Sequence, residues 1–170
     1  MRAHDSGDDL VDVVDDAGAV IGRATRREMR ARRLPHRSTY VLVFDRRGRL
    51  FMHLRTPTKD VYPSHWDVCV GGVVAAGESF DAGAARELVE ELGVSAPLEP
   101  LFPFHYADPT TVVHGMAYRT THDGPFRLQP EEIVQGEFAS IEDVLELAQW
   151  EPFCPDGLVL LRRYREEQSS

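Results

Sequence analysis

Three glutamates at helical spacing are the residues of this chain whose pattern points most clearly to chemistry. Glu87, Glu90 and Glu91 stand at positions i, i+3 and i+4, and on a helix this spacing places all three on one face. Like charges so spaced destabilise a helix by roughly 0.2–0.5 kcal/mol per pair, so folding alone gives no reason to gather them. A hard divalent cation does, because Mg²⁺ binds carboxylate oxygens and shares its coordination sphere with substrate phosphates.

The glutamates lie in a stretch, residues 72–94, that carries its own helix signals: GVVAAGESFDAGAARELVEELGV. Ser79 is the expected N-cap, so the helix should begin near residue 80, and Gly93 stands where a C-cap glycine belongs. Gly83 inside the helix costs up to about 1 kcal/mol relative to alanine, and the sequence offers no reason for it. An acidic helix face is often only solvated surface, but here the acids are embedded in a longer ordered pattern.

That pattern resembles the Nudix box, GX₅EX₇REUXEEXGU with U an aliphatic residue, and every specified position is met. The resemblance implies hydrolysis of a nucleoside diphosphate linked to another moiety, X. It also implies an α/β fold, a Nudix-type α/β/α sandwich with a mixed sheet, and Mg²⁺ or Mn²⁺ as the required cofactor. Homodimers are common in the resembled family.

Residue by residue, the resemblance assigns a metal-ligand set: Glu87, Glu90, Glu91 and the carbonyl of Gly71. One of Glu87 and Glu90 would also help to deprotonate the attacking water, and which of them does so stays open. Arg86 would pair with Glu78 and hold the helix against the preceding loop. Bound Mg²⁺ would neutralise the diphosphate and polarise a phosphorus atom.

Three further residues are candidates for the substrate side of the site. Arg55 and Lys59 precede the box, where cations can meet substrate phosphates; exposed loop charges are the equally weighted alternative. Glu132 follows the strand expected over residues 112–120, at a place where many Nudix enzymes carry an extra ligand or general base. A solvated acidic loop, with Glu131 and Glu137 in it, is the alternative there.

Length and composition bound the remaining function classes. The chain has 170 residues, 42% of them hydrophobic, which suffices for one core without disulfides. A net charge of −9 argues against a nucleic-acid polymer as partner, because such binding rests on basic patches. No apolar run approaches the ~20 residues of a membrane span, and two cysteines are too few for a disulfide framework. We expect a cytoplasmic enzyme acting on a small-molecule diphosphate.

The chain is expected to form one domain over residues 10–170, preceded by a disordered stretch, residues 1–9. Residues 10–35 make an N-terminal extension: a hairpin of strands 10–14 and 19–22, then a short basic helix, 25–33. The further elements expected are strands 40–44, 50–54, 66–70, 101–106, 112–120 and 137–139, and helices 141–147 and 156–168 besides the box helix.

The order of these elements also resembles the Nudix branch close to type 1 isopentenyl diphosphate isomerase, which makes isomerisation a rival reading. Aligning on the box glycine puts the isomerase's nucleophilic cysteine at Gly71 and a metal histidine at Val73; Cys69 lies two positions upstream of the cysteine slot. The isomerase's glutamate would fall in residues 111–118, which contain no acid. The hydrolase reading is therefore preferred.

A third class, a non-catalytic Nudix module that binds nucleotides, commonly loses box acids, and this chain has kept them. The histidines show no metal-ligand spacing: His36, His105, His114 and His122. Cys69 is expected to be a small buried hydrophobe, while Trp66, Phe104 and Tyr106 are expected to pack in the core. The identity of X is not set by the box.

Overall fold

The computed structural model describes residues 6–170, which form eight strands and four helices. The strands are β1 (Leu10–Val14), β2 (Val20–Thr25), β3 (His36–Phe44), β4 (Leu50–Arg55), β5 (Trp66–Asp67), β6 (Glu99–Ala107), β7 (Val112–Thr121) and β8 (Ile133–Ala139). The helices are α1 (Arg26–Ala31), α2 (Phe80–Leu92), α3 (Ile141–Leu147) and α4 (Pro155–Gln168).

One mixed sheet organises these elements. Strand β3 runs parallel to β7 in continuous register from His36 opposite Val113 to Phe44 opposite Thr121. On its other side β3 pairs antiparallel with β1 near its start and with β4 near its end. Strand β6 continues the sheet beyond β7, β8 and β5 flank β4, and β2 forms a hairpin with β1.

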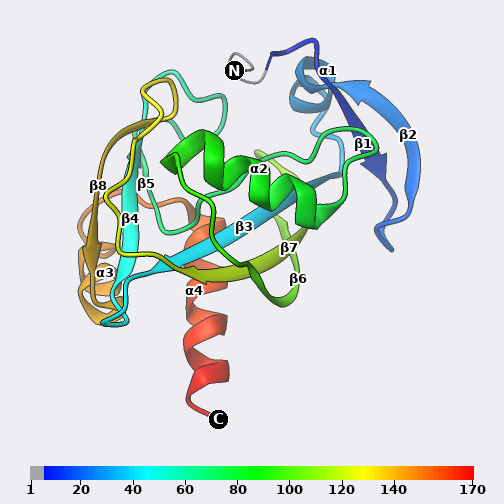
Figure 1. Cartoon of the computed structure of the whole chain (residues 1–170). Coiled ribbons are helices and arrows are strands. Elements are labelled where there is room, and N and C mark those ends of the chain that lie inside the picture. The colour runs from blue at the N-terminus through cyan, green and yellow to red at the C-terminus, as the bar shows by residue number, and fades with distance from the viewer. Residues whose placement is uncertain (1–5) are drawn as a thin grey trace.

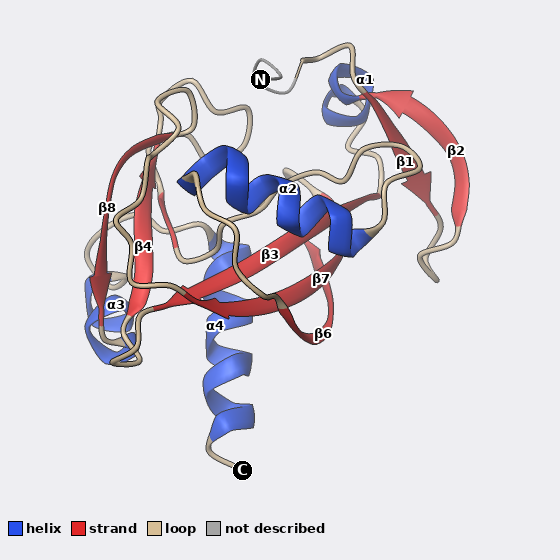
Figure 2. Ribbon diagram, viewed as in Figure 1, coloured by secondary structure: helices blue, strands red, loops and turns tan. Residues whose placement is uncertain are grey.

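Alternate side chains of β3 contribute to two hydrophobic clusters, one on each face of the sheet. Tyr40, Leu42 and Phe44 point into one cluster, which also contains buried residues of α3 and α4, whereas Val41 and Val43 point into a second cluster with the inner face of α2. Successive side chains of a strand face opposite sides of the sheet, so the second half of β3, which is apolar at every position, is covered on both faces. Figures 1 and 2 show α2 over one face and α4 over the other, which confirms the α/β/α sandwich.

Helix α2 has the ends that its sequence predicts. The Ser79 side chain accepts a hydrogen bond from the Ala82 amide at 3.1 Å, and Gly93 takes the left-handed conformation with φ of 70°. The structure also explains Gly83. A Cβ atom there would lie 3.0 Å from Oε1 of Glu78, so the glycine leaves room for the carboxylate that pairs with Arg86.

Several strands differ from the expected bounds. The strand expected over residues 66–70 is only β5, because the side chain of Asp67 accepts a hydrogen bond from the Cys69 amide and turns the chain. Beyond it, Val70 and Val73 make isolated bridges with β3, which brings the loop before α2 against the sheet. Strand β3 begins at residue 36 and not 40, and β8 begins at 133 and not 137, because both pair along their added length.

The N-terminal extension packs against the start of the sheet, with α1 beside the β1–β2 hairpin (Figure 1). Residues 1–5 of the stretch expected to be disordered lie outside the described residues. Residues 6–9 form a turn in which the Asp9 amide donates to the Ser6 carbonyl, and the Gly7 carbonyl accepts from the Arg27 amide. Within residues 6–170, no helix has the length and apolar character needed to cross a membrane.

Candidate active site

The glutamates of α2 line a small cavity. Glu87 and Glu91 are 4% and 6% exposed, and Glu90 stands at the partly exposed edge of the same helix face. The cavity has a volume of about 20 Å³, and Gly71, Gly72 and Glu132 contribute to its wall. This is room for roughly one water-sized species, so the acids converge on a space that fits a single ion.

Arg86 organises this face. Its guanidinium donates from Nε to Oε2 of Glu78 at 2.9 Å and from Nη2 to Oε1 at 3.0 Å, which confirms the pairing expected from the sequence. Its Nη1 donates to Glu87 and to Glu90, each at 3.1 Å. Glu78 also accepts from the Ala75 amide, so Arg86 ties the loop before α2 to the acidic face of this helix. The hydrogen bond to Glu78 raises the pKa of Arg86.

Two glycines allow the loop to approach the helix. Gly71 has φ of 150°, and a Cβ atom on it would lie 2.1 Å from the Thr39 carbonyl oxygen. A Cβ atom on Gly72 would lie 2.9 Å from Oε1 of Glu87. Backbone this close to a strand and to a carboxylate is accessible only to glycine, and it places the backbone of Gly72 beside Glu87.

The donor set fits a hard divalent cation. Burial, and next the neighbouring Glu87 charge, raise the pKa of Glu91 well above its usual range, as expected for buried carboxylates gathered without a compensating ion. Among the described residues, no three acidic, histidine or cysteine side chains already stand as a metal-ligand group. Glu87 and Glu90 pair with Arg86, and Glu132 forms an ion pair with Lys59. Carboxylate and carbonyl oxygens are nonetheless the ligands that Mg²⁺ prefers.

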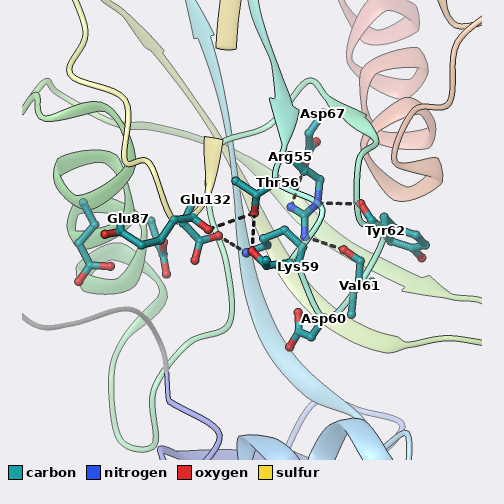
Figure 3. A network of polar contacts seen from close by, with 12 residues as sticks. Arg55, Thr56, Lys59, Asp60, Val61, Tyr62, Asp67, Glu87 and Glu132 are labelled. Carbon is teal, nitrogen blue, oxygen red and sulfur yellow. Dashed lines mark hydrogen bonds and ion pairs between the residues drawn. The ribbon is translucent and has the colours of Figure 1, made fainter. Parts of the chain in front are cut away.

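The three candidate substrate residues fall into two groups. Lys59 and Glu132 line the same cavity as the glutamates and pair with each other (Figure 3). Arg55 does not reach that cavity: it donates to the carbonyls of Val61 and Tyr62 at 2.8 and 3.3 Å and contacts Asp67. It thereby braces the loop over residues 56–65 and lines an adjoining cavity of about 80 Å³.

Sequence reasoning missed two cations of the N-terminal extension. Arg26 and Arg30 of α1 line the adjoining cavity with Arg55 and Lys59. Both pair with Asp60, whose Oδ2 lies 3.4 Å from Nε of Arg26 and 3.0 Å from Nε of Arg30. The available signal was their i, i+4 spacing in a helix recognised as basic, but nothing in the sequence placed that helix beside the box.

The features expected of the isomerase are arranged differently here. Cys69 is buried in the wall of the adjoining cavity, and burial raises the pKa of its thiol well above the usual range, which disfavours a nucleophilic thiolate. His36 lines the same cavity, and burial lowers its pKa to about 4. Its Nδ1 lies 2.9 Å from the Leu34 carbonyl oxygen, so it is a neutral, packed histidine at pH 7.

Comparison with known proteins gives a consistent result. The family model described as the NUDIX domain matches residues 34–163. The chain is 40% identical over 165 residues to an uncharacterized Nudix hydrolase of Pseudomonas aeruginosa, covering 95% of this chain and 98% of that one. It is 42% identical over 164 residues to an uncharacterized Nudix hydrolase of Streptomyces coelicolor, covering 94% and 90%.

Among solved structures, a crystal structure of a protein from Deinococcus radiodurans superposes with a TM-score of 0.80 at 28% identity, covering 91% of this chain and 98% of that chain. The similarity therefore extends over the N-terminal extension as well as the sheet and α2. With the matched domain spanning most of the chain, the protein belongs to the Nudix family and is a Nudix hydrolase, an enzyme class that acts on nucleoside diphosphate-linked compounds.

Proposed function

We propose that this enzyme hydrolyses a diphosphate linkage with Mg²⁺ or Mn²⁺ held by Glu87, Glu90, Glu91 and the carbonyl of Gly71. The observation that carries the proposal is the convergence of two buried α2 carboxylates on an ion-sized cavity walled by backbone glycines. When bound, the cation would neutralise the diphosphate and make its phosphorus more electrophilic. It would also relieve the repulsion between Glu87 and Glu91 that the folded chain otherwise bears.

The protein's own groups would position and activate the water. Glu87 or Glu90, each held by Arg86 at 3.1 Å, would accept the proton of the attacking water, and the bidentate Glu78 contact keeps Arg86 in place. General-base assistance of this kind contributes typically about 10²–10⁴-fold to rate. Arg86 does not reach the reacting atoms in this scheme and acts as a positioning residue.

Lys59 and Glu132 would complete the site opposite α2. Lys59 is paired with Glu132 at the cavity wall, so a substrate phosphate would compete with Glu132 for the ammonium group. Glu132, once released, would add a carboxylate to the metal-facing wall or act as the alternative base. Arg55 would act on the substrate side indirectly, by holding the Val61 and Tyr62 carbonyls and with them the loop that carries Lys59.

The direct test is a substrate panel. Purified protein would be incubated with nucleoside triphosphates, nucleotide sugars, dinucleoside polyphosphates and coenzyme diphosphate esters, with Mg²⁺ or Mn²⁺, and phosphorylated products would be quantified. We expect metal-dependent hydrolysis of at least one class, abolished by EDTA. Binding of these compounds without turnover under any metal condition would instead support a non-catalytic module. Conversion of isopentenyl diphosphate to its dimethylallyl isomer would support the isomerase reading.

A further inference from the structure

Helix α1 contributes to the wall of the active site although it lies outside the box and far from it in sequence. Arg26 lines both the glutamate cavity and the adjoining 80 Å³ cavity, and Arg30 lines the latter. The two arginines are one helical turn apart, so they share a face of α1. Neither is a freely moving surface side chain: Arg26 is 12% and Arg30 21% exposed.

The two cavities share part of their walls. Arg26, Lys59, Gly71 and Gly72 line both of them, so a molecule with one group beside Glu87 and Glu91 would place its next group in the adjoining cavity. Adjacent phosphate groups of a diphosphate lie close together. Two binding spaces that share four wall residues can therefore hold consecutive phosphates. The cavity beside the glutamates and the cavity beside the cations therefore lie next to each other.

The adjoining cavity also contains polar atoms that the protein leaves unsatisfied. Thr39 and Thr111 are buried, both line the cavity, and the Oγ1 atom of each has no hydrogen-bond partner. A buried hydroxyl without a partner costs free energy that is recovered when a ligand or water supplies one. Two such hydroxyls in one basic cavity favour the binding of a ligand that can hydrogen-bond to them.

Acids in the same wall hold the cations in place. Asp60 pairs with Arg26 and Arg30, Asp67 contacts Arg55, and Asp156 accepts from the Tyr40 hydroxyl at 3.0 Å. Burial and the neighbouring Asp67 raise the pKa of Asp156 to about 6. Because Asp60 is the acid that pairs with both α1 arginines, an anionic ligand would have to compete mainly with Asp60 for them.

We infer that the N-terminal extension is part of the substrate site: Arg26 and Arg30, together with Lys59, bind a phosphate group of the substrate next to the one attacked at the glutamates. The inference rests on the proposed function for the phosphate at the glutamates. It specifies a substrate with at least two consecutive phosphates. The group in the adjoining cavity must be compact, because 80 Å³ is far below the roughly 300–1,000 Å³ of pockets that enclose drug-sized ligands.

Calorimetric titration with inorganic diphosphate in the presence of EDTA tests this subsite apart from catalysis. Without metal the glutamates repel the anion, so binding reports on the cations. We expect wild type to bind and Arg30→Met to bind at least about tenfold more weakly, since a hydrogen bond to a charged group is lost. Asp60→Asn should bind more tightly than wild type, because it removes the acid that competes for both arginines.

The matched control is Arg27→Met. Arg27 lies on the same helix and pairs with Asp8, but it lines only an outer cavity and not the inner one, so its replacement should leave diphosphate affinity unchanged. Should Arg30→Met fail to fold, as judged by circular dichroism, Asp60→Asn decides: tighter binding supports the inference, and unchanged or weaker binding overturns it. Absence of wild-type binding, or equal loss in the Arg27 and Arg30 variants, also overturns it.

The outcome is separable from that of the proposed function. If wild-type protein binds diphosphate through Arg30 but hydrolyses no compound of the panel, the proposed hydrolysis is wrong and the proposed phosphate subsite is supported. If hydrolysis of a diphosphate depends on Glu91 but the protein binds no inorganic diphosphate, or binds it equally after Arg30→Met, the proposed hydrolysis is supported and the phosphate subsite is wrong.

Discussion

Three of the four acids that line the candidate metal site come from one stretch of α2, whereas the cations opposite them come from α1, the end of β4 and the loop that follows it. Glu87, Glu90 and Glu91 are placed by helix geometry and by a single arginine beneath them. The cations are each held by an acid from another segment, as with Arg30 and Asp60. The acidic side is thus assembled within one helix and its own arginine, and the basic side must exchange acids from distant segments for substrate phosphates.

The largest effect should follow from neutralising the acidic side. Glu90→Gln and Glu91→Gln keep side-chain size and remove one anionic ligand each, so turnover should fall by orders of magnitude while the circular dichroism spectrum is unchanged. Glu142→Gln, an acid in the first turn of α3, is the matched control and should be as active as wild type. Wild-type turnover in both α2 variants would refute the assignment.

Removing Arg86, which pairs with Glu87 and Glu90, should have the next largest effect. Arg86→Ala should lower turnover roughly 10–100-fold, the range seen when a residue that orients metal ligands is lost, because Glu87 and Glu90 lose their shared donor. A crystal structure of the variant should show Glu87 or the start of α2 displaced. Unaltered Glu87 geometry with only KM raised would mean that Arg86 contacts substrate and does not position ligands.

Stability should fall with acidification because two buried histidines are neutral. Burial lowers the pKa values of His36 and His53 to about 4. The unfolded chain binds these protons near pH 6.5, so stability present above that pH is lost progressively toward pH 4. Asp156, with its pKa raised to about 6, acts in the opposite direction between pH 6 and its unfolded value near 4. Denaturant titrations across this pH range should show the net loss of unfolding free energy. His53→Gln should make its pH dependence shallower by the contribution of about one proton.

The smallest effect is expected at Cys69, on the wall of the basic cavity. Cys69→Ala should retain most hydrolase activity and lose about 1 kcal/mol of unfolding free energy, as for other small core truncations. Hydrolysis assays and thermal unfolding measure the two. An isomerase activity present in wild type and abolished by this substitution would contradict the hydrolase account.

The contrast between the two sides also explains what could be read from the sequence. The α2 side is local: Ser79, Gly93 and the glutamates all act within one helix, so helix spacing and capping signals predicted their places. The Arg86–Glu78 pair spans only eight residues and was predicted by the resemblance to the Nudix box. The basic side joins Arg26 and Arg30 to Asp60, 34 and 30 residues away, and to Thr39 on β3 and Thr111 just before β7. No periodicity encodes such contacts.

Two local errors have the same kind of cause. The strand expected at residues 66–70 ends at Asp67 because that side chain bonds to the Cys69 amide, and a side-chain competitor for the backbone is not visible in an apolar pattern. Gly83 looked unexplained because its reason, the Glu78 carboxylate 3.0 Å from where its Cβ would be, lies outside the helix. In both cases a side-chain contact, and not the intrinsic propensity of the residues, determined the local structure.

The central claim is that the α2 carboxylates hold the catalytic ion, and the most direct measurement is the anomalous scattering of a crystal grown with Mn²⁺. The account predicts a peak in the cavity bounded by Gly71, Glu87 and Glu91, within metal–oxygen bonding distance of the carboxylates. Arg86 should still contact Glu78 but should have released Glu87 or Glu90. A peak elsewhere, or an empty cavity at a Mn²⁺ concentration that supports full turnover, would contradict the account.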